Sequence, residues 1–326
     1  MGNTAPPSIV VVGSGLAGFA VLRELRRLSP DAKLTMVTLE DGHFYSKPAL
    51  STALAKGKTP ETLVTSNAEK MIAQLKLDAR IGREAESIDR AGKALCTTGG
   101  PIPYDRLVLA MGATAYRPAI EGDAAHRAIS VNQLDHYAYF REQLLNQGRV
   151  LIMGSGLVGT EFANDLITNH YQVAVVDMLP LPLAQLVPPA VGESVREALT
   201  SEGVEWHLGR KVVAINYVGD STGYVATLDD GSNIEADLVL SAVGLRPNVA
   251  LAQEAGCSPS QLALAWLLQR ILTRGITRLG NRYPQLPAEL LMPLRGLLRW
   301  LVLGSAFMLV LERLGVSAQV LWGALT

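Results

Sequence analysis

The chain has 326 residues, of which 48% are hydrophobic and 18% are charged, and its formal net charge at pH 7 is −1. At roughly 150 residues per domain, this length is sufficient for two or three domains. The composition shows no basic face with interleaved aromatic residues, so we expect no nucleic-acid partner.

Charge and composition change near Gly256. Residues 1–256 hold 22 Lys and Arg against 28 Asp and Glu, whereas residues 257–326 hold seven Arg and two Glu, with neither Lys nor Asp. The second stretch also contains 19 Leu and three of the four Trp. We therefore expect a basic and apolar C-terminal tail that is distinct from the main body.

The two cysteines, Cys96 and Cys257, are isolated in the sequence. Their spacing excludes a disulfide framework, a thiolate metal site and a paired-thiol relay, and we expect no metal site. Residues 1–7 contain no apolar segment of the kind found in signal peptides. Two ordinary thiols without a signal peptide predict a cytoplasmic protein.

The first predicted unit is a strand, a glycine turn and a helix. A β-branched strand at 8–12 leads into Gly13-Ser-Gly15-Leu-Ala-Gly18, and apolar residues at helical spacing follow. The next strand is predicted at 34–39, with Glu40 and Asp41 at its end. Either acid is suited to accept hydrogen bonds from a ribose, and either is equally suited to a solvated loop. A helix around residues 71–75 and a buried strand at 107–114 follow.

The second predicted unit repeats this order. A strand at 150–153 leads into Gly154-Ser-Gly156-Leu-Val-Gly159 and an apolar-periodic helix. The following strand, 172–177, ends in Asp177, and no Arg or Lys comes directly after it in the sequence. An acid at this position favours NADH over NADPH. Further strands are predicted at 211–217, 224–228 and 236–248, with a hairpin turn at 229–231.

In a strand–turn–helix unit of this kind, the glycines let backbone amides and the helix N-terminus approach a pyrophosphate. Two such units predict two bound dinucleotides and electron transfer between them. The fold class that follows is α/β, with two Rossmann-like nucleotide-binding domains and a helical, hydrophobic tail. We place the domain boundaries at 1–115, 116–248 and 249–326.

The two glycine motifs occur in order with Tyr45-Ser-Lys-Pro48, Leu109-Ala-Met-Gly-Ala-Thr114, Glu161 and Ala242-Val-Gly-Leu-Arg-Pro247. Over residues 1–256 this combination resembles the FAD-dependent pyridine nucleotide-disulfide oxidoreductases, and most of all the rubredoxin–NAD(+) reductases. The resemblance implies a glutathione-reductase-like fold with FAD in the first domain and NADH in the second. It also implies transfer of electrons from NADH through FAD to a small iron protein such as rubredoxin.

The resemblance also implies the site residues. It places the FAD pyrophosphate, ribose and adenine near Gly13, Gly15, Leu16, Ala17, Gly18, Thr38, Glu40 and Ala85, and the rest of the FAD near Lys47, Pro48 and Ala113. It places NADH near Gly154, Gly156, Leu157, Val158, Gly159, Glu161, Asp177 and Gly244. The implied catalytic residues are Lys47, beside the flavin ring, and Glu161, with which Lys47 would pair. Without the resemblance, Lys47 is a surface lysine and Glu161 an acid that complements a helix dipole.

One part of the family pattern is missing. The family has a second FAD motif, an apolar strand ending in Gly-Asp, after the Arg-Pro-Asn segment, and then a C-terminal interface domain. Asp237 is the last aspartate of this chain, so that motif is absent. We therefore expect an incomplete FAD-binding domain and weak FAD binding.

The tail resembles other proteins instead. Residues 257–268 resemble a helix of aldo-keto reductases, although any amphipathic helix capped by Ser258 has the same pattern. Residues 290–326 resemble transmembrane helices of small-conductance mechanosensitive channels, but the uncharged run at 300–311 is shorter than the ~20 residues that span a bilayer. The tail is therefore predicted to be interfacial, marginally spanning or a buried helical hairpin. Two alternative functions follow: a membrane-associated, non-catalytic protein that binds NADH but not FAD, and a channel-like membrane fragment.

Overall fold

The computed structural model describes residues 6–144, 148–219 and 223–256. The chain divides into two units, Met1–Asn248 and Val249–Thr326. In the second unit, the described part contains α7 (Ala250–Glu254). The predictions for the tail at 257–326, including membrane association, lie outside the described residues. Within the described residues, no helix has the length and hydropathy needed to span a bilayer.

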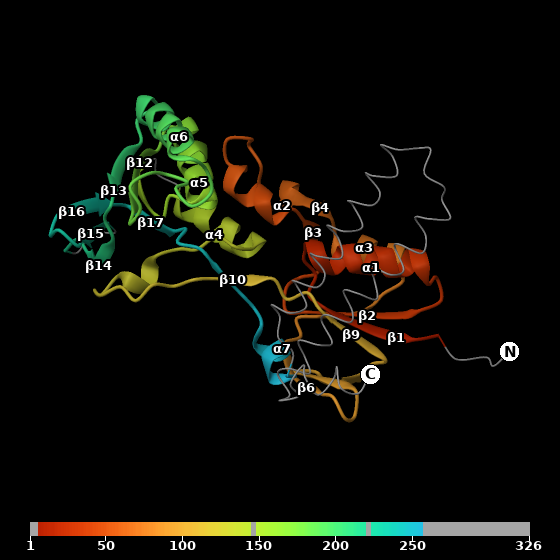
Figure 1. Cartoon of the computed structure of the whole chain (residues 1–326). Coiled ribbons are helices and arrows are strands. Elements are labelled where there is room, and N and C mark those ends of the chain that lie inside the picture. Colours follow the sequence, from red (N-terminus) through yellow and green to blue (C-terminus); the bar gives the residue numbers. More distant parts are fainter. Residues whose placement is uncertain (1–5, 145–147, 220–222, 257–326) are drawn as a thin grey trace, which may run out of the picture. The chain divides into compact units, whose positions relative to one another are not determined.

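The first half of the larger unit is built on a parallel four-stranded sheet (Figure 1). Its strand order is β5 (Asp78–Ile81), β2 (Lys33–Thr38), β1 (Ser8–Val12) and β9 (Arg106–Leu109). Helices α1 (Leu16–Leu28) and α3 (Ala68–Leu75) pack on one face, against Val11 and Met36. An antiparallel sheet of β6 (Ala85–Asp89), β7 (Ala94–Thr97) and β8 (Gly100–Pro103) covers the other, where Leu95 meets Val10 and Val12. Alternate β1 residues thus enter different cores.

The second half repeats this architecture. Its parallel sheet has the order β13 (Glu205–Leu208), β12 (Gln172–Asp177), β11 (Arg149–Met153) and β17 (Leu238–Ser241). Helices α4 (Leu134–Gln143), α5 (Leu157–Thr168) and α6 (Pro189–Ser201) belong to this half, as does an antiparallel sheet of β14 (Val212–Tyr217), β15 (Tyr224–Leu228) and β16 (Asn233–Ala236). The predicted α/β fold with two Rossmann-like halves is confirmed.

Two long predicted strands are each interrupted. The strand predicted at 107–114 is β9 followed by β10 (Ala113–Ala115), because Gly112 has a φ of +65°. The strand predicted at 236–248 is likewise broken at Gly244, where φ is +112°, between β17 and β18 (Leu245–Pro247). After these breaks, β10 and β18 pair with each other as an antiparallel ribbon between the two halves. An αL backbone cannot continue a strand, which explains both interruptions.

Residues 44–66 leave the first sheet: Phe44 still packs against α1, and later residues of the segment pack on the second half. The segment forms β3 (Phe44–Tyr45), the 3-10 helix η1 (Lys47–Thr52), α2 (Pro60–Leu63) and β4 (Val64–Ser66). Leu50 and Ala53 share one core with Phe140, Phe162 and Leu166 of the second half. The core therefore crosses the sequence boundary proposed at residue 115.

The equivalent outer strands, β9 and β17, have different surroundings. Ile129 pairs along β17, since its N–H donates to the Val239 carbonyl at 2.9 Å and its carbonyl accepts the Ser241 N–H at 2.7 Å. The four β17 side chains are buried. Within the described residues, β9 pairs only with β1, and its apolar residues are half-buried. Within the described residues, the outer edge of the first sheet is therefore unpaired along β9, whereas the outer edge of the second sheet is paired along β17 by Ile129.

Candidate nucleotide-binding sites

The first glycine turn connects β1 to α1 in a conformation that only glycine allows. Gly13 has a φ of +110°, and its N–H donates to the Val37 carbonyl at 2.8 Å. A Cβ on Gly18 would lie 1.9 Å from the Gly13 carbonyl oxygen, so any side chain there would push the helix off the strand. Tight turn geometry and close helix packing thus account for two of the three glycines.

The second turn, between β11 and α5, has the same geometry. Gly154 has a φ of +100° and donates to the Val176 carbonyl at 2.8 Å, while a Cβ on Gly159 would lie 1.9 Å from the Gly154 oxygen. The motifs predicted from sequence are therefore structurally equivalent turns. Even the hydrogen bond from the first glycine to the neighbouring strand is the same in both turns.

The middle glycine of each turn has a different role. A Cβ on Gly15 or Gly156 would meet no atom within 4 Å, so neither residue is required by packing. Both are the N-caps of their helices, and neither helix has a side chain that caps its first N–H groups. The short helix α3, by contrast, is capped by Asn67. Open space above uncapped N–H groups fits a pyrophosphate oxygen in both halves.

Side chains at the end of β2 form a polar cluster beside the first turn. The hydroxyls of Ser14 and Thr38 are hydrogen-bonded at 2.8 Å and buried. Glu40 accepts the Lys47 ammonium at 2.9 Å and the Tyr45 hydroxyl at 3.3 Å. Burial, followed by the charge of Glu40, raises the pKa of Tyr45 well above its ordinary range, so this hydroxyl remains a proton donor.

The predicted pairing of Lys47 with Glu161 is corrected by these contacts. Lys47 forms its ion pair with Glu40, and Glu161 instead accepts a hydrogen bond from the Ser51 hydroxyl. Both Lys47 and Ser51 belong to η1, but they lie at opposite ends of it. The chain reverses direction between β2 and η1 and so brings Glu40 within reach of Lys47. Lys47 therefore pairs with Glu40 and not with Glu161.

Asp177 ends β12 beside the second turn. One carboxylate oxygen accepts the N–H and the hydroxyl of Ser155, the latter at 2.9 Å, and the other accepts the Leu179 N–H at 2.8 Å. These bonds hold the carboxylate at the carboxyl end of the sheet, where a ribose would bind. The oxygen that accepts the Leu179 N–H retains a lone pair for a further donor, whereas both lone pairs of the other oxygen are used by Ser155.

A cation near Asp177 was missed by the sequence reading. The Arg210 N–H donates to the Asp177 carbonyl at 2.9 Å, and its guanidinium pairs with Asp230 at 2.9 Å. Arg210 follows β13, the strand that pairs with β12. Arg210 is thus a basic residue beside the backbone of Asp177, and its guanidinium is held by Asp230.

The other predicted site residues lie close to the strand ends or beyond them. Pro48 is in η1, Ala85 begins β6, Ala113 begins β10 and Gly244 forms the turn after β17. Large apolar side chains are also exposed near both turns: Leu16, Leu39 and Ile81 in the first half, and Leu157, Val158, Met178, Val243 and Leu245 in the second. Of these, Leu16, Leu157 and Val158 were predicted as site residues, and the other five were not. Their signal is an apolar residue at or directly after a parallel strand's carboxyl end, where a nucleotide base can cover it.

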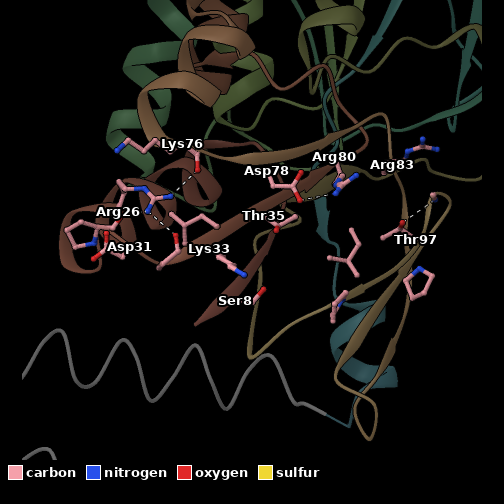
Figure 2. A pocket seen from close by; sticks show the side chains of 17 residues that line it. Ser8, Arg26, Asp31, Lys33, Thr35, Lys76, Asp78, Arg80, Arg83 and Thr97 are labelled. Carbon is pink, nitrogen blue, oxygen red and sulfur yellow. Dashed lines mark hydrogen bonds and ion pairs between the residues drawn. The ribbon is translucent and has the colours of Figure 1, made fainter. Parts of the chain in front are cut away.

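A cavity of about 710 Å³ lies elsewhere, at the amino ends of β1, β2 and β5 (Figure 2). Ser8, Lys33 and Asp78 line it, together with Arg26. The Arg26 guanidinium is already engaged by four backbone carbonyls. Because the glycine turns lie at the opposite, carboxyl ends of the strands, this cavity is not a candidate nucleotide site.

Comparison with known proteins agrees with this geometry. The model of the pyridine nucleotide-disulphide oxidoreductase family matches residues 7–261. A rubredoxin–NAD(+) reductase of Alcanivorax borkumensis is 40% identical over 273 residues, which cover 84% of this chain and 71% of that protein. The rubredoxin–NAD(+) reductase of Acinetobacter baylyi is 40% identical over 259 residues, covering 78% of this chain and 66% of that protein.

Solved structures give the same result. The structure of a covalent putidaredoxin reductase–putidaredoxin complex matches with a TM-score of 0.72 and 27% identity, covering 78% of this chain and 62% of that chain. A ferredoxin reductase from Rhodopseudomonas palustris matches with a TM-score of 0.70 and 29% identity, covering 77% and 62%. The matched part of this chain thus spans about two thirds of the length of these relatives.

Proposed function

Because the chain belongs to the pyridine nucleotide-disulphide oxidoreductase family, we propose that it is an NADH-dependent FAD flavoprotein that reduces a small iron protein of the rubredoxin class. The relatives named as rubredoxin–NAD(+) reductases support this choice of acceptor. FAD, when bound, would supply the chemistry that accepts a hydride and releases electrons.

The observation that carries this proposal is the pair of open, uncapped helix N-termini. Gly15 and Gly156 leave room where a side chain would otherwise stand, above N–H groups without a protein partner for capping. We assign the first turn to FAD and the second to NADH. In the first half, Thr38 and Glu40 lie near the turn and would face the ribose; in the second, Asp177 would.

Lys47 and Glu161 remain the proposed residues at the flavin. Lys47 would hold a positive charge near the ring, where it would stabilise added negative charge. Glu161 lies in the first turns of α5, close to the helix N-terminus that would hold NADH. In this arrangement the chain binds and orients two nucleotides, and no side chain has to act as a nucleophile.

The test is NADH-dependent reduction of a dye, and then of a purified rubredoxin, by the purified full chain with and without added FAD. We expect activity that requires NADH and increases with FAD. Gly15→Ala should reduce the response to FAD, and Gly156→Ala should reduce the response to NADH. Dye reduction that is absent at saturating FAD and NADH would reject the proposal.

A second candidate is a protein that binds NADH without FAD catalysis. Two observations favour it: β9 pairs only with β1 within the described residues, and residues 238–326 contain no aspartate. A colourless protein that binds NADH but takes up no FAD would establish this alternative.

A further inference from the structure

Asp165 is a buried carboxylate of α5 to which the proposed nucleotide binding assigns no role. Only 2% of it is exposed, and its two oxygens accept the backbone N–H groups of Leu54 and Ala55, each at 2.8 Å. Burial raises the pKa of this carboxyl, although the two N–H donors oppose that effect. A charge buried at this cost needs both of its hydrogen-bonded partners.

These contacts join two elements with separate proposed roles. Leu54 and Ala55 come directly after Ala53, the C-cap of η1, the 3-10 helix that begins with Lys47. The helix α5 has at its N-terminus the open turn proposed for NADH. Asp165 therefore connects the segment at the flavin to the helix at the second nucleotide.

A second contact lies one helical turn away. Ser51, near the C-terminal end of η1 and 3% exposed, donates to Glu161 of α5. Glu161 and Asp165 are four residues apart and so lie on the same face of α5. The apolar core beneath, which includes Leu50 and Phe162, is continuous between the two elements. Thus η1 is attached to α5 at two polar points above a shared core.

We propose that Asp165 is a positioning residue, which fixes η1 on α5 and thereby sets the position of Lys47 at the flavin relative to the bound NADH. This role rests on the proposed function. Hydride transfer depends steeply on the distance between the reacting atoms, and a displacement of about 1 Å costs roughly a hundredfold in rate. A short 3-10 helix released at one end is free to tilt, and Lys47 at its other end moves with it.

The first measurement concerns the attachment itself, in the protein without nucleotide. Asp165→Asn keeps the side-chain volume but replaces one acceptor oxygen with an amide that cannot accept an N–H. We expect hydrogen exchange at Leu54 and Ala55 to become about tenfold faster or more. The control is Asn164→Ala, an exposed neighbour on the same helix, which should leave both exchange rates unchanged.

The second measurement is single-turnover flavin reduction by NADH at saturating FAD. For Asp165→Asn we expect a limiting rate lowered about tenfold or more, with the NADH dissociation constant changed less than about twofold. Ser51→Ala, which removes the second contact with little change in volume, should act in the same direction. A thermal melt of each variant identifies any that does not fold, and Ser51→Ala then stands in for Asp165→Asn.

The outcomes are distinct. Faster amide exchange with an unchanged reduction rate would overturn the proposal, because the attachment would be purely structural. A changed NADH dissociation constant with an unchanged limiting rate would also overturn it, because Asp165 would then act through the nucleotide turn. A wild-type protein without any NADH-dependent flavin reduction rejects the proposed function, and this role of Asp165 with it. The exchange measurement still reports separately on the attachment.

Discussion

Asp177 is the last residue of the second strand in its half, whereas Glu40 lies two residues beyond the second strand of the other half, and the two acids have different partners. Asp177 is bonded by Ser155 and Leu179 of its own turn region, whereas Glu40 is engaged by Lys47 and Tyr45. Asp177 thus stays at the strand end, available to a ribose. Glu40 would have to share its carboxylate between a ribose and Lys47, with which it already pairs.

Replacing Asp177 should change nucleotide preference. The carboxylate would accept from a ribose 2′-hydroxyl and repel a 2′-phosphate, so Asp177→Ala should narrow the NADH-over-NADPH preference by about 1–3 kcal/mol. Dissociation constants for both nucleotides, measured by titration, test this.

The control for charge alone is Glu197→Ala, which removes an exposed acid from α6. It should leave the preference unchanged. Equal affinity of the wild-type protein for NADH and NADPH would contradict the assignment of Asp177.

Tyr45 should make stability depend on alkaline pH. Its pKa in the folded protein is raised above the ordinary 10.0, so above that pH the unfolded chain loses a proton that the folded chain keeps. Stability therefore falls as pH rises above 10.0. Tyr45→Phe should cost about 1–3 kcal/mol at neutral pH, because the Leu134 N–H loses its acceptor. Tyr45→Phe should also remove this dependence on alkaline pH. The difference in unfolding free energy between wild type and variant should therefore narrow above pH 10.0.

Denaturant unfolding at several pH values measures both effects. Tyr139→Phe, at an exposed tyrosine, is the control and should follow the wild-type curve. A wild-type-to-variant difference that stays constant across this pH range would show that Tyr45 ionises equally in both states.

At the scale of elements, the three glycines of each strand–turn–helix unit are needed for three different physical reasons. Gly154 provides a left-handed backbone, Gly159 allows α5 to approach the turn, and Gly156 leaves ligand space. The sequence motif weights all three equally. Only the surroundings of each Cβ position separate glycines that serve folding from the one that serves binding.

Two alanine variants should separate folding from binding. Gly159→Ala places a Cβ against backbone and should destabilise the protein by about 1–3 kcal/mol or more. Gly156→Ala should fold normally, because φ there is −68° and the Cβ meets nothing. It should nevertheless weaken NADH binding about tenfold or more, since the methyl group occupies the pyrophosphate approach.

Thermal unfolding and NADH titration of both variants check this pair. Normal NADH affinity in Gly156→Ala would show that the open space above α5 is not the binding position. Unchanged stability in Gly159→Ala would show that the close approach of α5 is not required.

At the scale of the whole molecule, the two halves have the same architecture but differ at one sheet edge. The strand β17 is paired along its outer side by Ile129, whereas β9 within the described residues pairs only with β1. A nucleotide site built from both the glycine turn and the outer strand of the sheet therefore has a more fully paired outer strand in the second half than the described residues provide in the first. This difference bears directly on FAD binding.

We expect FAD to be bound substoichiometrically after purification and NADH to bind normally. Each hydrogen bond lost to a charged group of FAD costs about 1.5–3 kcal/mol, and the missing Gly-Asp motif would have provided such contacts. The flavin absorbance per chain measures occupancy, and dye reduction should rise when FAD is added. A yellow protein with one FAD per chain, and activity indifferent to added FAD, would contradict the prediction.

The sequence by itself determined the α/β class, both glycine turns, the strand that ends in Asp177 and the family. These signals are local, since residue alternation and glycine spacing follow from one strand, one turn or one helix. Tertiary structure alone decided that Lys47 pairs with Glu40, that Arg210 lies beside Asp177 and that η1 is attached to α5 by Asp165. These contacts join different elements. They depend on the order of strands in a sheet and on which helix covers which segment, and no short stretch of sequence encodes that order.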